Sequence, residues 1–510
     1  MTKRSKKDDN VVEIDKRGRE VKHKVRNDLG ISDEEMIEAL LRNPATYEFA
    51  DLIPDPERHL GGRPRIYPKH LIFVVACVND IKKSARAAET AMKGERFWRH
   101  MQDVVAEMFP DDTSMHLPDR SPDRTWFAKT LRRKGMDVML DGFRHQLTTT
   151  GIETAVEIGC PITDKNQPWE PALNRMIAFD GKVIKSATSY AKGDEREVRL
   201  LDKTTGELTT VKRQRRHDPD AKFHMQGDKR RVRGNKFAAG WIRDVGEYQS
   251  AVPFVDHVPD EKGKHNSEGD VMMKNFGVIE PLLPGNVGVI TDTVSRGVHL
   301  DEMQREWSWV PFAPIAAAKV DKKTGERLAE KEGFIRSHAF KNCTRGSIEI
   351  WHQGGWLTQG IYDESGKRNL VRLEWLGDLR RKNKKTYRMY VEYRAACNCG
   401  EHTEVIRERT HSNDEDKARG FNRAENVRLV PPGSKLYDAI YGRRQDAESQ
   451  NRRIDDYLPL RRARSFGWQC QLFDLVAYAH VVNSIAKYRW GSSGTMRRDG
   501  ATPPDEHLAA

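Results

Sequence analysis

Apolar residues recur at helical spacing through the first third of the chain. From residue 69 to about residue 154 they follow the helical period. A shorter helix is predicted from Ser32 to Arg42, because Ser32 followed three positions later by Glu35 has the spacing of a capping box. Breaks between the predicted helices lie near Asp80, Gly94, residues 109–123 and Gly135. The pattern predicts an all-α N-terminal domain over residues 31–165.

After residue 170 the pattern changes to short apolar runs separated by polar residues. The runs that meet at Asp180 and Gly181 predict a strand, a tight turn and a second strand. Downstream we interpret two apolar runs as one bent strand, followed by a helix and a short strand. These elements lie at residues 237–243 with 251–258, 267–283 and 286–292. The predicted order over residues 170–310 is β-β-β-α-β, which indicates the α/β fold class.

Alternation of apolar and polar residues dominates residues 311–432 and predicts a β-rich insertion. The predicted strands lie at residues 347–351, 356–362, 370–376 and 387–393. Asp363-Glu-Ser-Gly366 predicts a hairpin turn between two of them. Residues 433–490 return to a helical pattern. The charged ends, residues 1–30 and 491–510, predict a disordered arm and a tail.

Composition adds an expectation about location and partners. The longest apolar run, Leu71 to Val78, is far shorter than the roughly 20 residues of a membrane-spanning helix. No apolar stretch follows the basic start, and six cysteines among 510 residues then predict reduced thiols in the cytoplasm. The formal net charge of +12 favours polyanions as partners, so association with the nucleoid is expected.

Much of the positive charge lies in residues 191–235, which lose apolar content and predict a loop. Two interpretations stay open: a solvated loop, or a loop that neutralises DNA phosphates. For the second, the candidate contacts are Arg215, Arg216, Arg230 and Arg231.

Two N-terminal segments can likewise be interpreted either as DNA-binding elements or as ordinary structural segments. Arg63 and Arg65 in Gly-Arg-Pro-Arg resemble the core of an AT-hook, whose arginines enter a narrow minor groove, but the segment also fits a linker. Residues 82–92 fit the second helix of a helix-turn-helix, or simply one of several amphipathic helices that pack together.

Three carboxylates are candidates for catalysis. On a helix, Tyr441, Arg444 and Glu448 would share one face, since they are spaced i, i+3 and i+7. Asp180 and Asp292 each end a short apolar strand, where an open sheet displays ligand-binding residues. Three carboxylates suit Mg²⁺, or Mn²⁺ in its place, and two such ions could clamp a phosphodiester during in-line displacement. The predicted reaction class is phosphoryl transfer.

With these residues in view, the chain resembles the DDE transposases of bacterial insertion sequences, in the branch marked by Tyr-x2-Arg-x3-Glu-x6-Lys. Tyr441, Arg444 and Glu448 match the first three positions. The resemblance implies a ribonuclease H-like core, with Asp180 on the first strand, Asp292 on the fourth and Glu448 on a later helix as catalytic metal ligands. It also implies the β-rich insertion between Asp292 and Glu448.

The resemblance implies that the protein binds double-stranded DNA at the terminal inverted repeats of a mobile element. Metal-dependent cleavage and strand transfer would follow, carried out by a homodimer on DNA. Tyr441 and Arg444 would then orient DNA phosphates.

The sequence departs from that signature at two places. Asp455 stands where the signature has Lys, and Arg452 and Arg453 nearby are candidate replacements for the phosphate contact. Asp292 is not followed by the aromatic residue usual in the family, so Asp256 and Asp270 are rivals for its role. Two other functions stay open: an endonuclease of the same fold that cuts without joining, and a non-catalytic, domesticated DNA-binding protein.

Two further features of the insertion have open interpretations. Its cysteines and one histidine could hold zinc or remain free; the residues are Cys343, Cys397, Cys399 and His402. Its tryptophans fit sheet packing, although in the family an insertion tryptophan can hold a flipped base; the candidates are Trp351, Trp356 and Trp375.

Overall fold

A computed structural model describes most of the chain between residues 31 and 497. The segments left out within this span are residues 55–65, 133–135, 161–174, 202–206, 226–229, 244–249, 260–266, 316–318, 321–326, 344–345 and 384. The predicted arm over residues 1–30, Arg63, Arg65 and residues 498–510 therefore lie outside the described residues.

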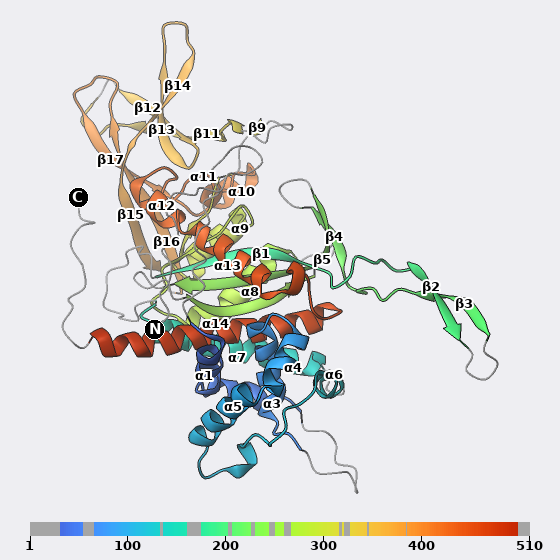
Figure 1. Ribbon diagram of the computed structural model, residues 1–510. Coiled ribbons are helices and arrows are strands. Elements are labelled where there is room, and N and C mark those ends of the chain that lie inside the picture. Colours follow the sequence, from blue (N-terminus) through green and yellow to red (C-terminus); the bar gives the residue numbers. More distant parts are fainter. Residues whose placement is uncertain are drawn as a thin grey trace, which may run out of the picture.

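A mixed β-sheet lies at the centre of the molecule (Figure 1). Its two longest strands, β1 (Met176–Lys185) and β5 (Arg231–Arg243), run antiparallel. Two more strands pair antiparallel with the far edge of β5, namely β4 (Lys222–Met225) and β6 (Ser250–Val258). On the other side of β1, β7 (Gly288–Ile290) and then β8 (Val310–Phe312) continue the sheet in parallel. The strand order is therefore β6-β5-β1-β7-β8, with β4 beside the start of β5.

The two faces of the sheet enter different cores, because neighbouring residues of a strand point to opposite faces. In β1, Ile177 and Phe179 pack into a core that contains α8 (Glu268–Ile279) and residues of α9 (Gly297–Glu306). The alternate residue Ala178 faces the core shared with the insertion. Asp180, two positions further on, therefore points to the same face as Ala178.

Helices α1 to α7 occupy the segment predicted to be helical, and the boundaries from α3 to α7 fall at the predicted breaks. Ser32 caps α1 together with Glu35, which confirms the predicted capping box. Short α2 was not predicted. The bounds are α1 (Asp33–Leu41), α2 (Ala45–Asp51), α3 (His70–Ile81), α4 (Ala85–Lys93), α5 (Glu95–Met108), the 3-10 helix η1 (Thr113–Met115), α6 (Arg124–Arg132) and α7 (Met136–Glu157).

These helices share one core with the end of the chain. The long helix α14 (Trp468–Arg497) runs across them beneath the sheet (Figure 1). Phe473 of α14 contacts Phe73 and Phe143 edge-on, with ring centroids 6.3 and 5.4 Å apart. The N-terminal helices and α14 therefore form a single hydrophobic unit.

Helix α14 also covers β6, the edge strand of the sheet. The Asn483 side chain accepts a hydrogen bond from Val252 N (2.7 Å) and donates one to Val252 O (3.1 Å). Asn483 is only 1% exposed, so these bonds satisfy its buried amide and part of the strand edge at once.

The insertion consists of two antiparallel sheets beside a small hairpin (Figure 1). The first sheet contains β11 (Glu332–Ala339), β12 (Ser347–Gln353), β13 (Trp356–Tyr362) and β14 (Arg368–Arg372). The second contains β15 (Glu374–Asn383), β16 (Thr386–Ala396) and β17 (Thr403–Arg409). The hairpin is β9 (Lys319–Val320) with β10 (Arg327–Ala329), and the helices that follow are α10 (Asp414–Ala418), α11 (Arg423–Asn426), α12 (Lys435–Tyr441) and α13 (Arg444–Tyr457).

Several predictions about the strands are wrong. No turn interrupts β1 at Asp180 and Gly181, and the segments predicted as one bent strand are the separate antiparallel strands β5 and β6. The predicted strand at residues 370–376 is divided between β14 and β15, and β17 was not predicted. The Asp363–Gly366 turn between β13 and β14 is confirmed, since Gly366 N donates to Asp363 O (2.9 Å).

Two other predictions are wrong, one about the basic segment and one about the C-terminal tail. Residues 191–235 do not form a loop throughout, since β2 (Glu195–Leu201) pairs with β3 (Leu208–Gln214) in an antiparallel ribbon that projects from the body (Figure 1). Residues 491–497, predicted as tail, continue α14. In the part of the chain that is described, no helix is both long and apolar enough to cross a membrane.

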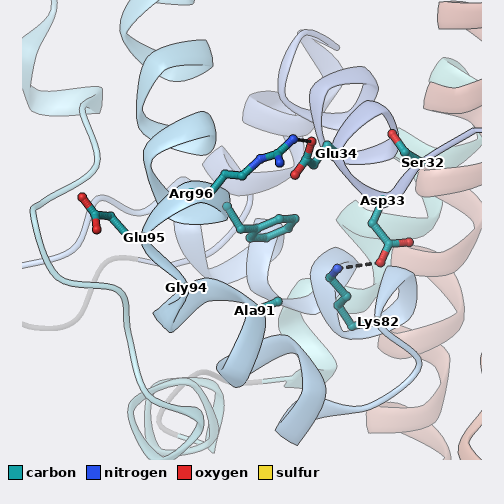
Figure 2. A pocket seen from close by; sticks show the side chains of 9 residues that line it. Ser32, Asp33, Glu34, Lys82, Ala91, Gly94, Glu95 and Arg96 are labelled. Carbon is teal, nitrogen blue, oxygen red and sulfur yellow. Dashed lines mark hydrogen bonds and ion pairs between the residues drawn. The ribbon is translucent and has the colours of Figure 1, made fainter. Parts of the chain in front are cut away.

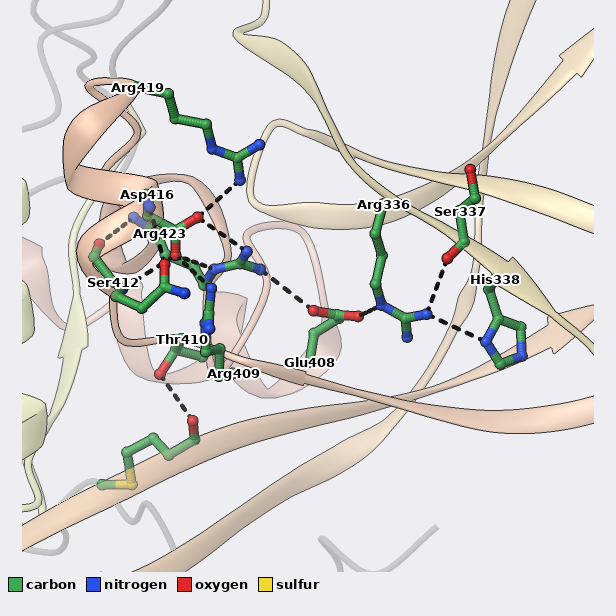
Figure 3. Close-up of polar contacts among 12 residues, drawn as sticks. Arg336, Ser337, His338, Glu408, Arg409, Thr410, Ser412, Asp416, Arg419 and Arg423 are labelled. Atoms are coloured by element: carbon green, nitrogen blue, oxygen red, sulfur yellow. Dashed lines mark hydrogen bonds and ion pairs between the residues drawn. The ribbon is translucent and has the colours of Figure 1, made fainter.

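A buried network of charges joins the two insertion sheets to α10 and α11 (Figure 3). Glu408 of β17 pairs with Arg336 of β11 and with Arg423 of α11. Asp416 accepts hydrogen bonds from Arg409, Arg419 and Arg423. Burial raises the pKa of Asp416, but the bonds from Arg423 and Arg419 outweigh that effect and hold the pKa at about 2.

We expect Asp416→Asn to lower the free energy of unfolding at pH 7 by about 2 kcal/mol, because the charge-assisted hydrogen bonds from three arginines are weakened while Glu408 still neutralises Arg423. A carboxyl group whose pKa is lower in the folded state stabilises the fold above its ordinary pKa of 3.8, and this stabilisation is lost as the pH falls towards about 2. Urea titrations at several pH values should therefore show a shallower loss of stability below pH 4 in the variant. An unchanged pH dependence would contradict this assignment.

Candidate active site

The site begins where the parallel pairing of β1 with β7 stops, because β7 ends at Ile290 while β1 continues to Lys185. Strands β1 and β7 are in register with Ala178 opposite Ile290. Asp180 follows two residues later within β1, and Asp292 follows two residues later in the loop after β7. Burial raises the pKa of Asp180, and Asp292 lies close enough for its charge to raise this pKa further. Asp180 is half-buried, and the Asp292 side chain is 37% exposed. The structure therefore brings together two residues that are 112 positions apart.

Helix α13 is held against β1, β5 and β6 by polar contacts along its length. Near its start, Asp446 pairs with Arg243 of β5. Gln450 Nε2 then donates to Ser250 Oγ at the start of β6 (2.7 Å). Asn451 Nδ2 donates to Asp180 Oδ2 on β1 (2.8 Å). The helix is thereby fixed over the edge that carries Asp180.

Glu448 extends from the same helix and is linked to Asp292 through Arg444. Arg444 Nη1 donates to Glu448 Oε1 (2.8 Å), and Arg444 Nη2 lies 3.9 Å from Asp292 Oδ2. Glu448 is exposed, with 63% of its side chain accessible. One guanidinium group thus stands between two of the three predicted carboxylates.

Tyr441 lies beside this group but not on the same helix. Helix α12 ends at Tyr441 and α13 begins at Arg444, so the prediction of one continuous helix face is wrong. The Tyr441 ring stacks on Tyr437, with centroids 5.1 Å apart. Burial raises the pKa of Tyr441. The charge of Arg444 lowers this pKa, whereas the carboxylate of Asp292 raises it further.

The electrostatics of Asp180 favour a cation nearby. Burial raises its pKa to about 6, and the neighbouring charge of Asp292 adds to the increase, although Arg444 opposes it. Half-buried carboxylates with too little compensating positive charge are suited to a hard divalent ion, which prefers oxygen ligands. Asp180, Asp292 and Glu448 would hold such an ion.

The carboxylate groups of Asp180, Asp292 and Glu448 do not form a compact cluster. Among the described residues they do not bring three oxygen atoms within 4.8 Å of one another; only the cysteines of the insertion reach that compactness. Arg444 explains part of the spacing, because its guanidinium group contacts both Asp292 and Glu448. Joint metal binding by these two residues would replace those ion pairs.

Sequence reasoning missed two residues near Asp180, of which one bonds to it and the other lies against Gly181. Asn451 donates to the Asp180 carboxylate and lies three positions after Glu448, on the same face of α13, so helical spacing could have indicated it. Glu268, at the start of α8, pairs with Lys236 and lies so close to Gly181 that a Cβ atom there would overlap its carboxylate. No local pattern marks Glu268, because this contact joins distant parts of the chain.

The lysine missing from α13 has a counterpart on β1. Asp455 pairs with Lys182 (Nζ to Oδ2, 2.8 Å), and the two side chains are 33% and 15% exposed. Lys182 follows Asp180 by two residues and therefore points to the same face of the sheet. A cation thus lies beside this turn of α13, supplied by the strand instead of the helix.

A double-mutant cycle should measure this ion pair. We expect Lys182→Met and Asp455→Asn each to lower the free energy of unfolding by about 1 kcal/mol, because a partly buried pair contributes more than an exposed one. The double variant should cost less than both singles together, with a coupling energy of about 1 kcal/mol measured by urea denaturation. Strict additivity would mean that the two side chains do not interact.

The rivals of Asp292 have structural roles instead. Asp256 is 4% exposed, and its carboxylate accepts hydrogen bonds from Arg144 (2.6 Å) and Asn275 (3.3 Å). Asp270 caps α8 through Ser267. Of these three aspartates, only Asp292 lies at the strand edge beside Asp180.

Most of the predicted DNA contacts lie apart from the carboxylates. Arg452 is exposed on α13 itself. Arg215 and Arg216, at the base of the β2–β3 ribbon, lie over the rings of Tyr190 (4.3 Å) and Phe466 (4.1 Å). The remaining two are exposed near the start of β5, where Arg231 lies over the Phe223 ring; these residues are Arg230 and Arg231.

The β2–β3 ribbon also carries basic residues, some of which are next to acidic residues. The basic residues are Arg196, Arg199, Lys212 and Arg213.

The insertion tryptophans are mostly occupied within the insertion. Trp356 Nε1 donates to Pro432 O (2.7 Å), and Trp375 packs against the insertion core. Trp351 lies against Phe334 and is covered by Arg368, 3.6 Å from its ring centroid. These contacts favour sheet packing over base stacking.

A separate hollow of about 650 Å³ lies among the N-terminal helices (Figure 2). Its charged groups pair across it: Lys82 with Asp33 (2.5 Å) and Arg96 with Glu34 (2.8 Å). Helices α3 and α4 meet beside it at Lys83, whose φ of +57° makes the sharp turn. These charged groups already compensate one another through ion pairs, which does not favour a charged ligand in the hollow. The carboxylates of Asp180, Asp292 and Glu448 therefore remain the candidate site.

Comparison with known proteins adds no assignment. No protein-family model matches the chain, and a search of curated proteins gives no significant match.

Proposed function

We propose that the protein is a DDE-type DNA transposase with a ribonuclease H-like core, which binds terminal inverted repeats, cleaves DNA in a metal-dependent reaction and joins the ends to target DNA. The observation that carries the proposal is the meeting of Asp180 and Asp292 at one edge of a parallel strand pair, beneath the helix that bears Arg444 and Glu448. The strand order β6-β5-β1-β7-β8, with only β1, β7 and β8 parallel, supports the proposed core.

In this proposal Asp180, Asp292 and Glu448 bind divalent metal. When bound, Mg²⁺ stabilises charge on the attacking and leaving oxygens of a phosphodiester. Asn451 holds the Asp180 carboxylate in place by its hydrogen bond. Attack comes from water in the first step and from a DNA 3′-hydroxyl in the second.

Positively charged groups around the edge would position the DNA. Arg444 pairs with Asp292 and Glu448; were these carboxylates to hold a metal ion, the guanidinium group would be available for a bidentate contact with a phosphate. Tyr441 offers a phenolic hydroxyl beside it. Lys182 brings an ammonium group to the part of the site where the branch signature has its lysine. The basic residues of the β2–β3 ribbon and the start of β5 would extend the contact along the duplex.

The test is a strand-transfer assay with duplexes taken from the DNA on either side of the gene. We expect nicked and joined products with Mg²⁺ or Mn²⁺ and none with EDTA. Glu448→Gln should abolish both products, whereas Glu302→Gln, which changes another exposed glutamate, on α9, should leave them unchanged. Full activity of the Glu448 variant would reject the proposal, and products that are cut but never joined would favour an endonuclease.

A non-catalytic DNA-binding protein is the second candidate. The ion pairs of Arg444 with Asp292 and Glu448 favour it, because one guanidinium group offsets part of the charge of these two carboxylates. In that case the duplexes should bind equally well with EDTA, and no nicking should appear with either metal ion.

A further inference from the structure

Three cysteines from two different sheets meet at one end of the insertion. Cys343 lies in the connection between β11 and β12, and Cys397 and Cys399 lie in the turn between β16 and β17. Cys397 is buried, Cys343 is half-buried and Cys399 is exposed. The chain separates Cys343 from the other two by more than 50 residues, so folding alone brings the thiols together.

The spacing of the sulfur atoms matches a tetrahedral metal site. Cys343 Sγ lies 3.6 Å from Cys397 Sγ and 3.8 Å from Cys399 Sγ, and all three sulfurs lie within 4.8 Å of one another. Zinc binds thiolates at about 2.3 Å, and at tetrahedral angles this bond length separates two sulfurs by about 3.8 Å. The thiols therefore stand at the distances of three corners of such a site.

His402, in the same turn, is a candidate for the fourth ligand, although of these residues only the three cysteines lie within 4.8 Å of one another. His402 Nδ1 lies 3.2 Å from Cys399 Sγ. The turn is closed by two backbone hydrogen bonds, from Cys397 N to His402 O (2.8 Å) and from Gly400 N to Cys397 O (2.9 Å). The positive φ of Gly400 (+80°) permits this tight path. Two thiols and the imidazole are thus presented by a single short loop.

The opposite wall of the cluster leaves room for the sulfur atoms. A Cβ atom at Gly346 would overlap Cys397 Sγ and lie 3.5 Å from Cys343 Sγ. Around the cluster, Glu404 of β17 accepts hydrogen bonds from Lys341 N (2.7 Å) and is 3.2 Å from His338 Nε2 of β11. The two loops are consequently aligned by contacts that do not involve the thiols.

We propose that Cys343, Cys397, Cys399 and His402 form a structural Zn²⁺ site that ties the β11–β14 sheet to the β15–β17 sheet. Soft thiolates with an imidazole are the ligand set that selects zinc over magnesium or calcium. A disulfide would use only two of the three thiols and leave the third beside it. A closed site of four protein ligands has no place for substrate, so its role is to stabilise the insertion.

The test measures metal in the full-length chain, purified without a histidine tag under reducing conditions and analysed by mass spectrometry of the elements. We expect about one zinc ion per chain. Cys343→Ser and Cys399→Ser should each remove most of it, whereas Cys470→Ser, a cysteine of α14 with similar exposure to Cys343, should retain it. Replacing zinc with Co²⁺ should give the visible absorption of tetrahedral cobalt with thiolate ligands.

His402 is tested separately, because its loss leaves the three thiols in place. We expect His402→Ala to weaken zinc binding at least about tenfold in a chelator competition. Its neighbour Glu401 is exposed, and Glu401→Ala should leave the affinity unchanged. Zinc affinity unchanged in the His402 variant would overturn this ligand assignment.

The zinc proposal as a whole is overturned if the unsubstituted chain holds no stoichiometric zinc and shows no such Co²⁺ spectrum, or if Cys343→Ser retains the metal. Detection of a disulfide among these cysteines in the isolated protein would also overturn it. Metal content is measured without DNA, so these results do not depend on the proposed transposase activity.

Discussion

Asp180→Asn should reduce DNA cleavage at least about 10³-fold, because a bound metal ion contributes several kcal/mol to stabilising the transition state and this variant loses a central ligand. The amide retains the size of the carboxyl group. Its oxygen can still accept the hydrogen bond from Asn451, so the fold around β1 should persist. The loss would therefore report on metal binding and not on the arrangement of the strands.

The same substitution should make the metal-free protein more stable. A carboxyl group whose pKa is raised to about 6 in the folded state destabilises the fold when it is ionised, and this cost is present above pH 6. Replacing it with a neutral amide removes that cost, and we expect a gain of about 1 kcal/mol in the free energy of unfolding at pH 8. At pH 4 the carboxyl group of Asp180 in the unsubstituted protein is largely protonated, and therefore neutral like the amide of the variant, so the gain in stability should disappear.

Urea denaturation with EDTA at both pH values measures the gain, and nicking of supercoiled plasmid with Mn²⁺ measures the loss. A variant that loses activity because it is misfolded would lose stability as well. Higher stability together with lost cleavage therefore separates a site residue from a structural one. Retained cleavage would remove Asp180 from the proposed mechanism.

Arg464→Met should lower the free energy of unfolding by about 4 kcal/mol, because removing one partner of a buried ion pair leaves uncompensated charge in the core. Arg464 is 10% exposed and lies 2.6 Å from Asp80 of α3 and 3.6 Å from Asp474 of α14. Burial raises the pKa of Asp80 to about 7 even beside this cation. Without Arg464, both carboxylates would have to take up protons or leave the core.

The matched control is Arg461→Met, three residues earlier and exposed, for which we expect a change within about 0.5 kcal/mol. A second comparison uses the double variant Asp80→Leu with Arg464→Met. Since apolar replacement of a buried pair is often nearly neutral, the double variant should recover part of the loss. Equal stability of the Arg461 and Arg464 variants in urea titrations would show that the buried pair contributes nothing.

Features encoded by neighbouring residues were predictable from the sequence. Ser32 with Glu35 identifies the start of α1, because a capping box satisfies backbone groups within one turn. The Asp363–Gly366 turn is equally local. Helix ends near Gly94 follow from the weak helical preference of glycine.

Errors arose where a distant contact determines the local structure. Gly181 suggests a turn, but it lies within β1, and Glu268 from α8 lies directly against it. The apolar run at residues 370–376 changes sheets around Leu373, whose N–H bonds to Leu357 O. The β2–β3 ribbon is largely exposed, so no apolar face marks its strands.

The candidate site shows the same division. Asp180, Asp292 and Glu448 could be selected because each stands in a recognisable local pattern. The pairing of Lys182 with Asp455 could not, since nothing in either segment indicates the other. Arg444 was predicted to contact phosphate, but its position between two carboxylates depends on how α13 packs against β1.

The place of α14 along the chain has a consequence for biosynthesis. Its residues complete the core around Phe49, Phe73 and Phe143, and its Asn483 covers the edge of β6. Ribosomes add about 5 to 20 residues per second, so the aromatic groups of the nascent N-terminal helices await their partner for tens of seconds. Prematurely terminated chains that lack residues 468–497 would keep this apolar surface uncovered, and chaperones and proteases should recognise them as unfinished.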